Sequence, residues 1–253
     1  IWAALGEVTN YIEPFAGSLA VLLGRPSGHT GREVVNDADG FVCNAWRAIR
    51  NHPEETAAHA GWPVLEPDLH ARAAVLAERR ANLVTRLEGD PAWFDAELAG
   101  WWVWGVCASI AEYPPPGPWE RVDGELRKLP SVKSQGDDAV GVGHSMPHVA
   151  KASWTGLNAG DPDDRGAWIR AWFVELSRRL RDVVICCGDW SWMTGDLVTR
   201  DVGMTGIFLD PPYSSLDRSS VYAEDNFSIA QAVREWAIEI GEDLARRIVV
   251  AGY

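Results

Sequence analysis

The 253-residue sequence contains no apolar run long enough to span a membrane, and it shows no signal peptide. Its four cysteines, Cys43, Cys107, Cys186 and Cys187, are not spaced as metal ligands usually are. Cys186 and Cys187 lie in an apolar run and are expected to be buried thiols. These features argue against a membrane protein and predict a cytoplasmic protein in a reducing compartment, with no metal site.

Positive charge is scarce in this chain. There are 23 lysines and arginines against 36 aspartates and glutamates, which gives a formal net charge of −13. A protein that grips a nucleic-acid backbone usually presents a basic face. A nucleic-acid partner therefore requires that the basic residues cluster in space, that the contact is weak, or that the substrate is not a long duplex.

The length and the 47% hydrophobic content are sufficient for a large core, either as one large domain or as one domain with a sizeable insertion. No internal repeat is present. The chain begins at Ile1 and ends at Tyr253 just after an apolar run. We therefore expect that it is cut from a longer protein.

A short stretch near the C-terminal end organises the prediction. Ile207, Phe208 and Leu209 form an apolar run that is typical of a buried parallel strand. The strand must end at Asp210, because two prolines follow and proline cannot continue a ladder. This places Asp-Pro-Pro-Tyr at the carboxyl edge of the sheet, where open α/β sheets bind ligands.

The residue types at that edge suit one kind of ligand. They supply a carboxylate, a rigid turn with exposed carbonyls and the aromatic face of Tyr213, which together can hold an extruded planar base by its exocyclic amine. The alternative is an ordinary Pro-Pro turn after a core strand, with Tyr213 as a surface aromatic.

The N-terminal part predicts a strand, a tight turn and a helix. Tyr11 and Ile12 end the strand, residues 16–18 form a turn in which glycine allows close backbone approach, and residues 19–23 begin the helix. This order is typical of the first βα unit of a nucleotide-binding sheet. An ordinary βα turn that contains a glycine is the alternative.

A second strand, at residues 32–37, ends in Asp37. It follows the turn by about 20 residues, the spacing at which an acid bonds ribose hydroxyls in nucleotide-binding folds. Alternatively, Asp37 or Asp39 caps a helix over residues 40–51. Both interpretations can hold, because two acids are available.

The middle of the chain has a different pattern. It predicts helices over residues 68–87, 91–111 and 163–180 and a long loop over residues 129–160. The tryptophans of the second helix are expected in a helical core, and stacking on bases is the alternative. His144 and His148 in that loop are assigned no role. Residues 229–240 predict a helix, and residues 247–250 predict the last strand.

The strand over residues 181–190 ends in Gly188-Asp189-Trp190. Here an acid and an aromatic again stand at the carboxyl edge of a strand, where they suit the amine and the face of an adenine. The alternative is a turn aspartate beside a core tryptophan.

Four motifs occur in a fixed order along the chain. They are Glu13-Pro14-Phe15-Ala16-Gly17-Ser18, Asn36-Asp37, Gly188-Asp189-Trp190 and Asp210-Pro211-Pro212-Tyr213. In residues and in order they resemble the Dam class of adenine-specific N6 DNA methyltransferases, in which the cofactor motif precedes the catalytic one. The resemblance is strongest over residues 10–50 and 183–215. The middle of the chain is similar to phage and actinobacterial DNA methylases.

For the cofactor, the resemblance implies S-adenosyl-L-methionine bound to a Rossmann-like sheet. The segment that begins at Glu13 would hold it, with residues 15–18 passing under its methionine part. Asp37 would bind the ribose hydroxyls. Asp189 would accept a hydrogen bond from the cofactor's adenine amine, with Trp190 as a packing face.

For catalysis, the resemblance implies that a target adenine is flipped out of DNA into the site formed by residues 210–213. Asp210 and the Pro211 carbonyl would accept hydrogen bonds from the target amine, Pro212 would stiffen the turn, and Tyr213 would stack on the base. The chain departs from the family at Leu19, where a second glycine is usual, and a lysine-bearing motif is not visible before Tyr11.

The sequence thus predicts an α/β methyltransferase domain from residues 1–54 and 181–253, with a mostly helical insertion over residues 55–180 that serves target recognition. Methylation of RNA is one alternative, and a non-catalytic cofactor- or nucleic-acid-binding module is another. A protein-amide methyltransferase is disfavoured, because the motif of that family resembles Asn-Pro-Pro-Tyr, whereas the first residue here is Asp210. A phage, a restriction–modification and a housekeeping role all stay open.

Overall fold

The computed structural model describes residues 1–109, 113–114, 119–122, 125–128, 162–199, 203–212 and 220–251. The chain divides into two compact units. The first unit contains residues 1–38 and 182–253, and the second contains residues 39–181.

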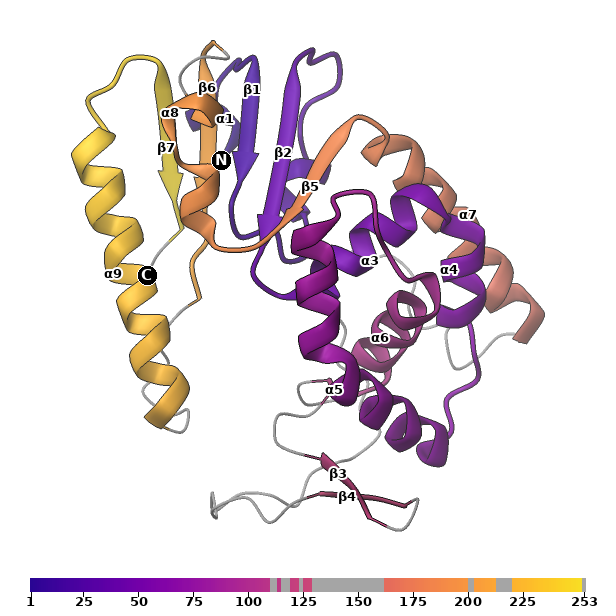
Figure 1. Ribbon diagram of the computed structural model, residues 1–253. Coiled ribbons are helices and arrows are strands. Elements are labelled where there is room, and N and C mark those ends of the chain that lie inside the picture. The colour runs from indigo at the N-terminus through magenta and orange to yellow at the C-terminus, as the bar shows by residue number, and fades with distance from the viewer. Residues whose placement is uncertain are drawn as a thin grey trace. The chain divides into compact units, whose positions relative to one another are not determined.

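Five parallel strands form the sheet of the first unit (Figure 1). They are β1 (Asn10–Glu13), β2 (Arg32–Asp37), β5 (Val183–Cys187), β6 (Thr205–Leu209) and β7 (Arg246–Val250). Their order across the sheet is β5-β2-β1-β6-β7, and every neighbouring pair is parallel. The α/β class expected from the sequence is confirmed at this level, and the order is compatible with a Rossmann-like sheet.

The strand order reverses between β1 and β6. From β1 the chain adds β2 and then β5 on one side, and it later adds β6 and β7 on the other side of β1. In open α/β sheets the crevice beyond the carboxyl ends of the strands at such a reversal is the usual place for a ligand. The fold therefore marks the ends of β1 and β6 as the first place to look for a site.

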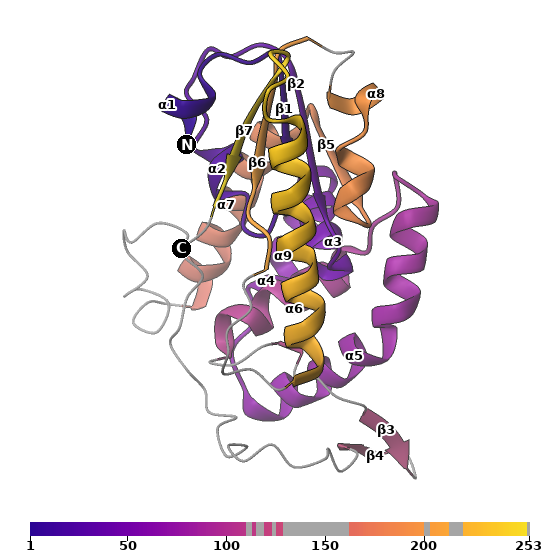
Figure 2. The ribbon, with the colours of Figure 1, turned by 90° about the vertical axis from the view of Figure 1, so that its left-hand side faces the viewer.

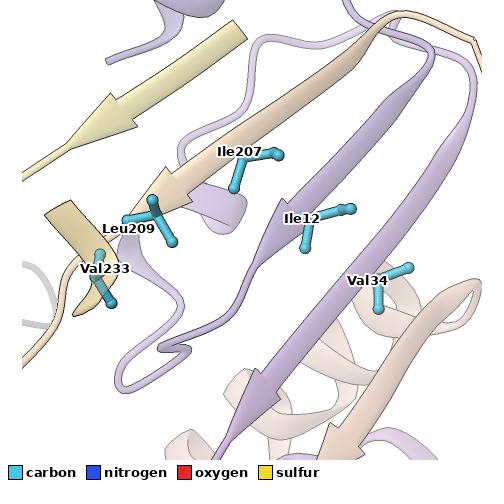
Figure 3. Close-up of a cluster of buried hydrophobic side chains, with 5 residues drawn as sticks. All are labelled: Ile12, Val34, Ile207, Leu209 and Val233. Carbon is cyan, nitrogen blue, oxygen red and sulfur yellow. The ribbon is translucent and has the colours of Figure 1, made fainter. Parts of the chain in front are cut away.

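An aliphatic core fixes the central strands. Ile12 of β1 lies opposite both Val34 of β2 and Ile207 of β6, and these side chains pack with Leu209 of β6 and with Val233 (Figure 3). All five are at most 1% exposed. Burial of each such side chain contributes about 1.5–3 kcal/mol, so this cluster holds β1 and β6 side by side.

The helices of the first unit are short, except for the one that carries Val233. They are α1 (Trp2–Leu5), α2 (Ala20–Leu23), the 3₁₀ helix η2 (Trp190–Met193), α8 (Asp196–Thr199) and the long α9 (Ser220–Ile240). Figure 2 shows α9 running alongside β6 and β7. The sequence predicted only residues 229–240 of α9, because residues 220–228 show no clear apolar period.

The second unit is mostly helical. It consists of α3 (Gly40–Asn51), α4 (Pro53–Ala60), α5 (Glu66–Gly89), α6 (Ala96–Ala108), α7 (Pro162–Leu180) and the antiparallel hairpin of β3 (Trp119–Val122) and β4 (Glu125–Lys128). Small side chains allow these helices to approach closely. A Cβ added to Gly100 of α6, for example, would stand 2.4 Å from the Cβ of His59 in α4.

The helices predicted over residues 68–87, 91–111 and 163–180 are present as α5, α6 and α7 with shifted bounds, and the helix over residues 40–51 is present as α3. The helix expected from residue 91 begins only at Ala96, because the Asp95 side chain caps it by accepting a hydrogen bond from the Leu98 N–H at 2.9 Å. The sequence analysis identified neither α4 nor the hairpin. The loop expected over residues 129–160, with His144 and His148, lies outside the described residues.

The first boundary between the units differs from the expected one. The prediction placed residues 1–54 with the sheet, whereas the second unit begins at residue 39 and includes α3. The reason is packing, since Ala45 and Ala48 of α3 form a buried cluster with Ala96 and Ala99 of α6. The later boundary, expected between residues 180 and 181, falls between residues 181 and 182.

Candidate functional site

Four strand ends of the first unit carry the residues that the sequence singled out. Pro14 follows β1, Asp37 ends β2, Gly188 follows β5 and Asp210 follows β6. Because β5, β2, β1 and β6 are neighbours and parallel, these residues stand along one edge of the sheet. Segments that are far apart in the sequence are thus brought together there.

The end of β2 holds the loop that follows β1. The Ala16 N–H donates to the Asn36 carbonyl at 2.8 Å, and the Gly17 N–H donates to Oδ2 of Asp37 at 2.9 Å. Gly17 has φ 44°, and a Cβ there would meet no protein atom within 4 Å. The loop therefore turns tightly and leaves the backbone at Gly17 open on one side, with Gly17 and Ser18 exposed.

The sequence offers two acids, Asp37 and Asp39, as the cap of α3, and the structure shows which of them it is. Asp39 is the cap, since its Oδ1 accepts from the Phe41 N–H at 2.8 Å. Asp37 instead faces the loop after β1 through its contact with Gly17. Asp37 is thus placed at the edge of the sheet, as the spacing predicted.

Glu13 is the most deeply buried of the predicted site residues that carry a charge, at 2% exposure. Its Oε2 accepts from the Tyr11 hydroxyl at 2.9 Å, and its carboxyl accepts from the backbone N–H of Leu22. Burial, helped by the nearby charge of Asp210, raises the pKa of Glu13 from 4.5 to about 7, although the two hydrogen bonds act to lower it. Glu13 and Asp210 are therefore electrostatic neighbours.

Tyr11 is the fixed donor in this pair. It is fully buried, and burial together with the Glu13 carboxyl raises the pKa of its hydroxyl. Tyr11 therefore keeps its proton at neutral pH and donates a hydrogen bond to Glu13. This hydrogen bond orients the Glu13 carboxyl at the end of β1, where the following loop begins.

Three aromatic side chains meet at the end of β5. Trp190 stacks on Phe15, with ring centroids 6.2 Å apart and planes inclined by 26°, and it meets the edge of Trp236 of α9 at 6.1 Å. Oδ1 of Asp189 accepts from the Ser191 N–H at 2.9 Å and from the Ser191 hydroxyl, so it caps η2. The turn aspartate beside a packed tryptophan, which the sequence left as an alternative, is present.

The catalytic motif of the prediction is described in part. Asp210 is exposed directly after β6, Pro211 is buried and Pro212 is half-buried. The backbone of the preceding residue remains in the sheet, since the Leu209 carbonyl accepts from the Ala251 N–H at 2.7 Å. Tyr213 lies outside the described residues.

The sequence analysis gave no role to Tyr11 or to the Asn36 side chain. The Asn36 amide nitrogen donates to the Pro14 carbonyl at 3.1 Å and to the Gly188 carbonyl at 2.9 Å. An asparagine that directly follows the apolar pair Val34 and Val35 and precedes the terminal acid of the strand was the available signal. A polar residue at a central strand position needs internal partners, which are found at the strand ends here.

Within the ranges that the structure describes, no group of three histidine, cysteine, aspartate or glutamate side chains is arranged to hold a metal ion. The same part of the chain contains no helix that is both long and apolar enough to cross a membrane. All four cysteines are thiols.

Leu19 stands where the resembled family usually has glycine, and its backbone is left-handed, with φ 55° and ψ 23°. Its side chain is fully buried, which offsets the cost of this conformation. We expect Leu19→Gly to be more stable than Leu19→Ala by about 1 kcal/mol, because glycine has no Cβ to strain there. Urea unfolding of both variants measures the difference.

At an ordinary helical position alanine is the more stable of the two by about 1 kcal/mol, so the sign of the difference identifies the cause. Ala20→Gly, one residue further into α2, is the matched control and should be less stable than the wild type. An alanine variant at position 19 that is more stable than the glycine variant would rule out the left-handed conformation.

We compared the chain with protein families and with curated proteins. No family model matches it, and no curated protein matches it significantly.

Proposed function

We propose that this chain is an S-adenosyl-L-methionine-dependent methyltransferase with a Rossmann-like sheet, and that it methylates the N6 amine of adenine in DNA. The observation that carries the proposal is the meeting of described residues from four separate motifs at one edge of a parallel sheet, beside the reversal of strand order. The motifs resemble those of the Dam class, and the placement of their described residues is compatible with the roles that the resemblance implies.

The residues present fit the cofactor. The backbone at Gly17 is open to a ligand, and the loop that contains it is held by hydrogen bonds to Asn36 and Asp37. Carboxylates at the ends of β2 and after β5 suit hydroxyl and amine donors. The acidic edge, with Glu13 beside Asp210, suits a positively charged sulfonium.

In this proposal the loop at residues 15–18 lies under the methionine part of the cofactor. Asp37 accepts hydrogen bonds from the ribose hydroxyls. Asp189 accepts one from the adenine amine, and the Trp190 face packs nearby. When bound, S-adenosyl-L-methionine supplies an activated methyl group.

The chain's own chemistry is then to orient the target amine. The lone pair of the adenine amine is delocalised into the ring, so the amine is a poor nucleophile. The Asp210 carboxylate and the Pro211 carbonyl each accept a hydrogen bond from this amine, which turns the lone pair toward the methyl group. Preorganised acceptors and proximity account for much of the acceleration, and Tyr213 stacks on the flipped base.

The test is methyl transfer itself. The purified chain is incubated with methyl-labelled cofactor and with DNA or RNA of matched sequence, and the product is digested to nucleosides. We expect labelled N6-methyladenine from DNA. Label in RNA alone would show that RNA, and not DNA, is the substrate. Cofactor binding without any methyl transfer would show that the chain is a non-catalytic binding module.

Two acids should determine cofactor affinity. We expect Asp37→Ala and Asp189→Ala each to weaken S-adenosyl-L-methionine binding by about 1–3 kcal/mol, the cost of a lost charge-assisted hydrogen bond. Isothermal titration calorimetry measures the change. Asp37→Asn should lose less than Asp37→Ala, because it keeps an acceptor for the Gly17 N–H.

Asp39→Ala is the matched control for both variants. It removes the same charge and a cap of the same kind, since Asp39 caps α3 as Asp189 caps η2. Its cofactor affinity should equal that of the wild type even if α3 is destabilised. Unchanged affinity in both Asp37→Ala and Asp189→Ala would remove the cofactor assignment.

A further inference from the structure

The side chain of Asn36 connects two loops of the candidate site. It projects from β2, between β1 and β5, and it is 1% exposed. Its amide nitrogen uses both hydrogens, one for the Pro14 carbonyl after β1 and one for the Gly188 carbonyl after β5. Because both partners are carbonyls, only the amide nitrogen can face them, and this fixes the orientation of the amide.

The backbone at the same place strengthens the connection. The Asn36 carbonyl accepts from the Ala16 N–H, and the carbonyl of Asp37 accepts from the Gly188 N–H at 3.0 Å. The last two residues of β2 therefore hold both neighbouring loops, through side chain and main chain together. These loops lead into Gly17 and Asp189, the residues that the proposed function gives to the cofactor.

The connection has a cost that packing alone does not explain. Oδ1 of Asn36 is buried and has no hydrogen-bond partner among the described residues. A buried acceptor without a partner is unfavourable, and an aliphatic side chain of similar size would avoid the penalty. What an aliphatic side chain cannot supply is the pair of donors that fixes the distance between the two loops.

We propose that Asn36 is a positioning residue that holds the loop after β1 and the loop after β5 at the separation the cofactor requires. This inference rests on the proposed function, because it concerns the cofactor site of that proposal. Asn36 acts through the loops and need not touch the cofactor. Its loss should therefore reduce cofactor affinity and leave the rate at saturating cofactor nearly unchanged.

The chain contains a closely matched control at the opposite edge of the sheet, where the amino ends of the strands lie. Asn10 begins β1, is fully buried, and donates through its amide nitrogen to the Val198 carbonyl at 2.8 Å and to the Thr205 hydroxyl at 3.0 Å. Its Oδ1 is also buried without a partner in the described part of the chain. Asn10 thus shares the chemistry of Asn36 but holds no loop of the candidate site.

The experiment compares Asn36→Ala with Asn10→Ala in the full chain, by calorimetric titration with S-adenosyl-L-methionine and by single-turnover methyl transfer. For Asn36→Ala we expect a dissociation constant raised roughly tenfold, equal to the lower end of the range for residues that orient the ligands of a metal ion. The rate at saturating cofactor should stay within about twofold of the wild type, since the loops close on the cofactor once it is bound. Asn10→Ala should keep the wild-type dissociation constant.

A second variant keeps the test decisive if Asn36→Ala does not fold. Asn36→Asp has the same shape and opens no cavity, yet it replaces the donating amine with an oxygen, so the same rise is expected. Equal affinities of the Asn36 variants and the wild type would overturn the positioning role and leave the proposed function intact. A wild-type chain that binds no S-adenosyl-L-methionine would overturn both.

Discussion

Replacement of Asp210 with alanine is expected to slow methyl transfer about 10²–10³-fold, as removal of one preorganised polar contact does in other active sites. Cofactor affinity should barely change. Asp210 is exposed at the end of β6, beside the buried Pro211 and at the reversal of strand order. Its carboxylate is thus placed to meet a substrate and is not needed to fill the core.

The measurement is single-turnover methyl transfer at saturating cofactor, which separates the chemical step from binding. Asp210→Asn keeps the shape and one acceptor oxygen. It should therefore be less damaging than alanine if hydrogen bonding dominates, and equally damaging if charge does.

Glu242→Ala is the control, because this exposed carboxylate lies just before β7, at the opposite edge of the sheet, and its loss changes the net charge equally. The control should transfer methyl groups at the wild-type rate. A wild-type rate in Asp210→Ala as well would mean that the catalytic site lies elsewhere, and the central proposal would fail.

Much of the sheet could be predicted because its strands are short apolar runs with clear stops. Ile207 to Leu209 end at a double proline, and the β5 run ends at a glycine and an acid. Such stops also place acids at the carboxyl edge, which is why the candidate site could be proposed before the fold was known. The parallel register that joins the strands depends on residues far apart in the sequence, and local patterns do not contain it.

Other features of the site required coordinates for physical reasons. Asp37 and Asp39 are chemically identical and two residues apart, so only the observed bond from the Phe41 N–H assigns the cap to Asp39. The first boundary between the units depends on the packing of Ala45 against α6, which is some fifty residues further along the chain. The contact between Phe15 and Trp190 likewise joins residues that are far apart in the sequence, and local patterns do not predict it.

The stability of the protein should fall as the pH rises through the range in which Glu13 loses its proton. Burial raises the pKa of this carboxyl from 4.5 to about 7. The folded state therefore binds this proton more tightly than the unfolded state does. Its stabilising effect is complete below about pH 4.5 and is lost by about pH 7, where the charged carboxylate remains buried next to Asp210.

Glu13→Gln should remove this dependence on pH. Glutamine is uncharged, and its carbonyl oxygen can still accept a hydrogen bond from the Tyr11 hydroxyl. One pKa unit corresponds to about 1.4 kcal/mol, so the stability of the variant relative to the wild type should grow by about 2–3 kcal/mol between pH 5 and pH 8. Urea unfolding followed by tryptophan fluorescence, at a series of pH values, gives this difference.

Glu33→Gln distinguishes this effect from the general effect of removing a buried carboxylate. Glu33 is also buried, but its Oε1 accepts from Nη1 of the buried Arg25 at 3.0 Å and lies 2.9 Å from Nε2 of His29. Its neutralisation leaves the Arg25 cation without its counter-charge, so Glu33→Gln should be less stable than the wild type at pH 8. At pH 8 we therefore expect Glu13→Gln to be more stable than the wild type and Glu33→Gln to be less stable. Parallel pH profiles for Glu13→Gln and the wild type would show that Glu13 is not the group that titrates.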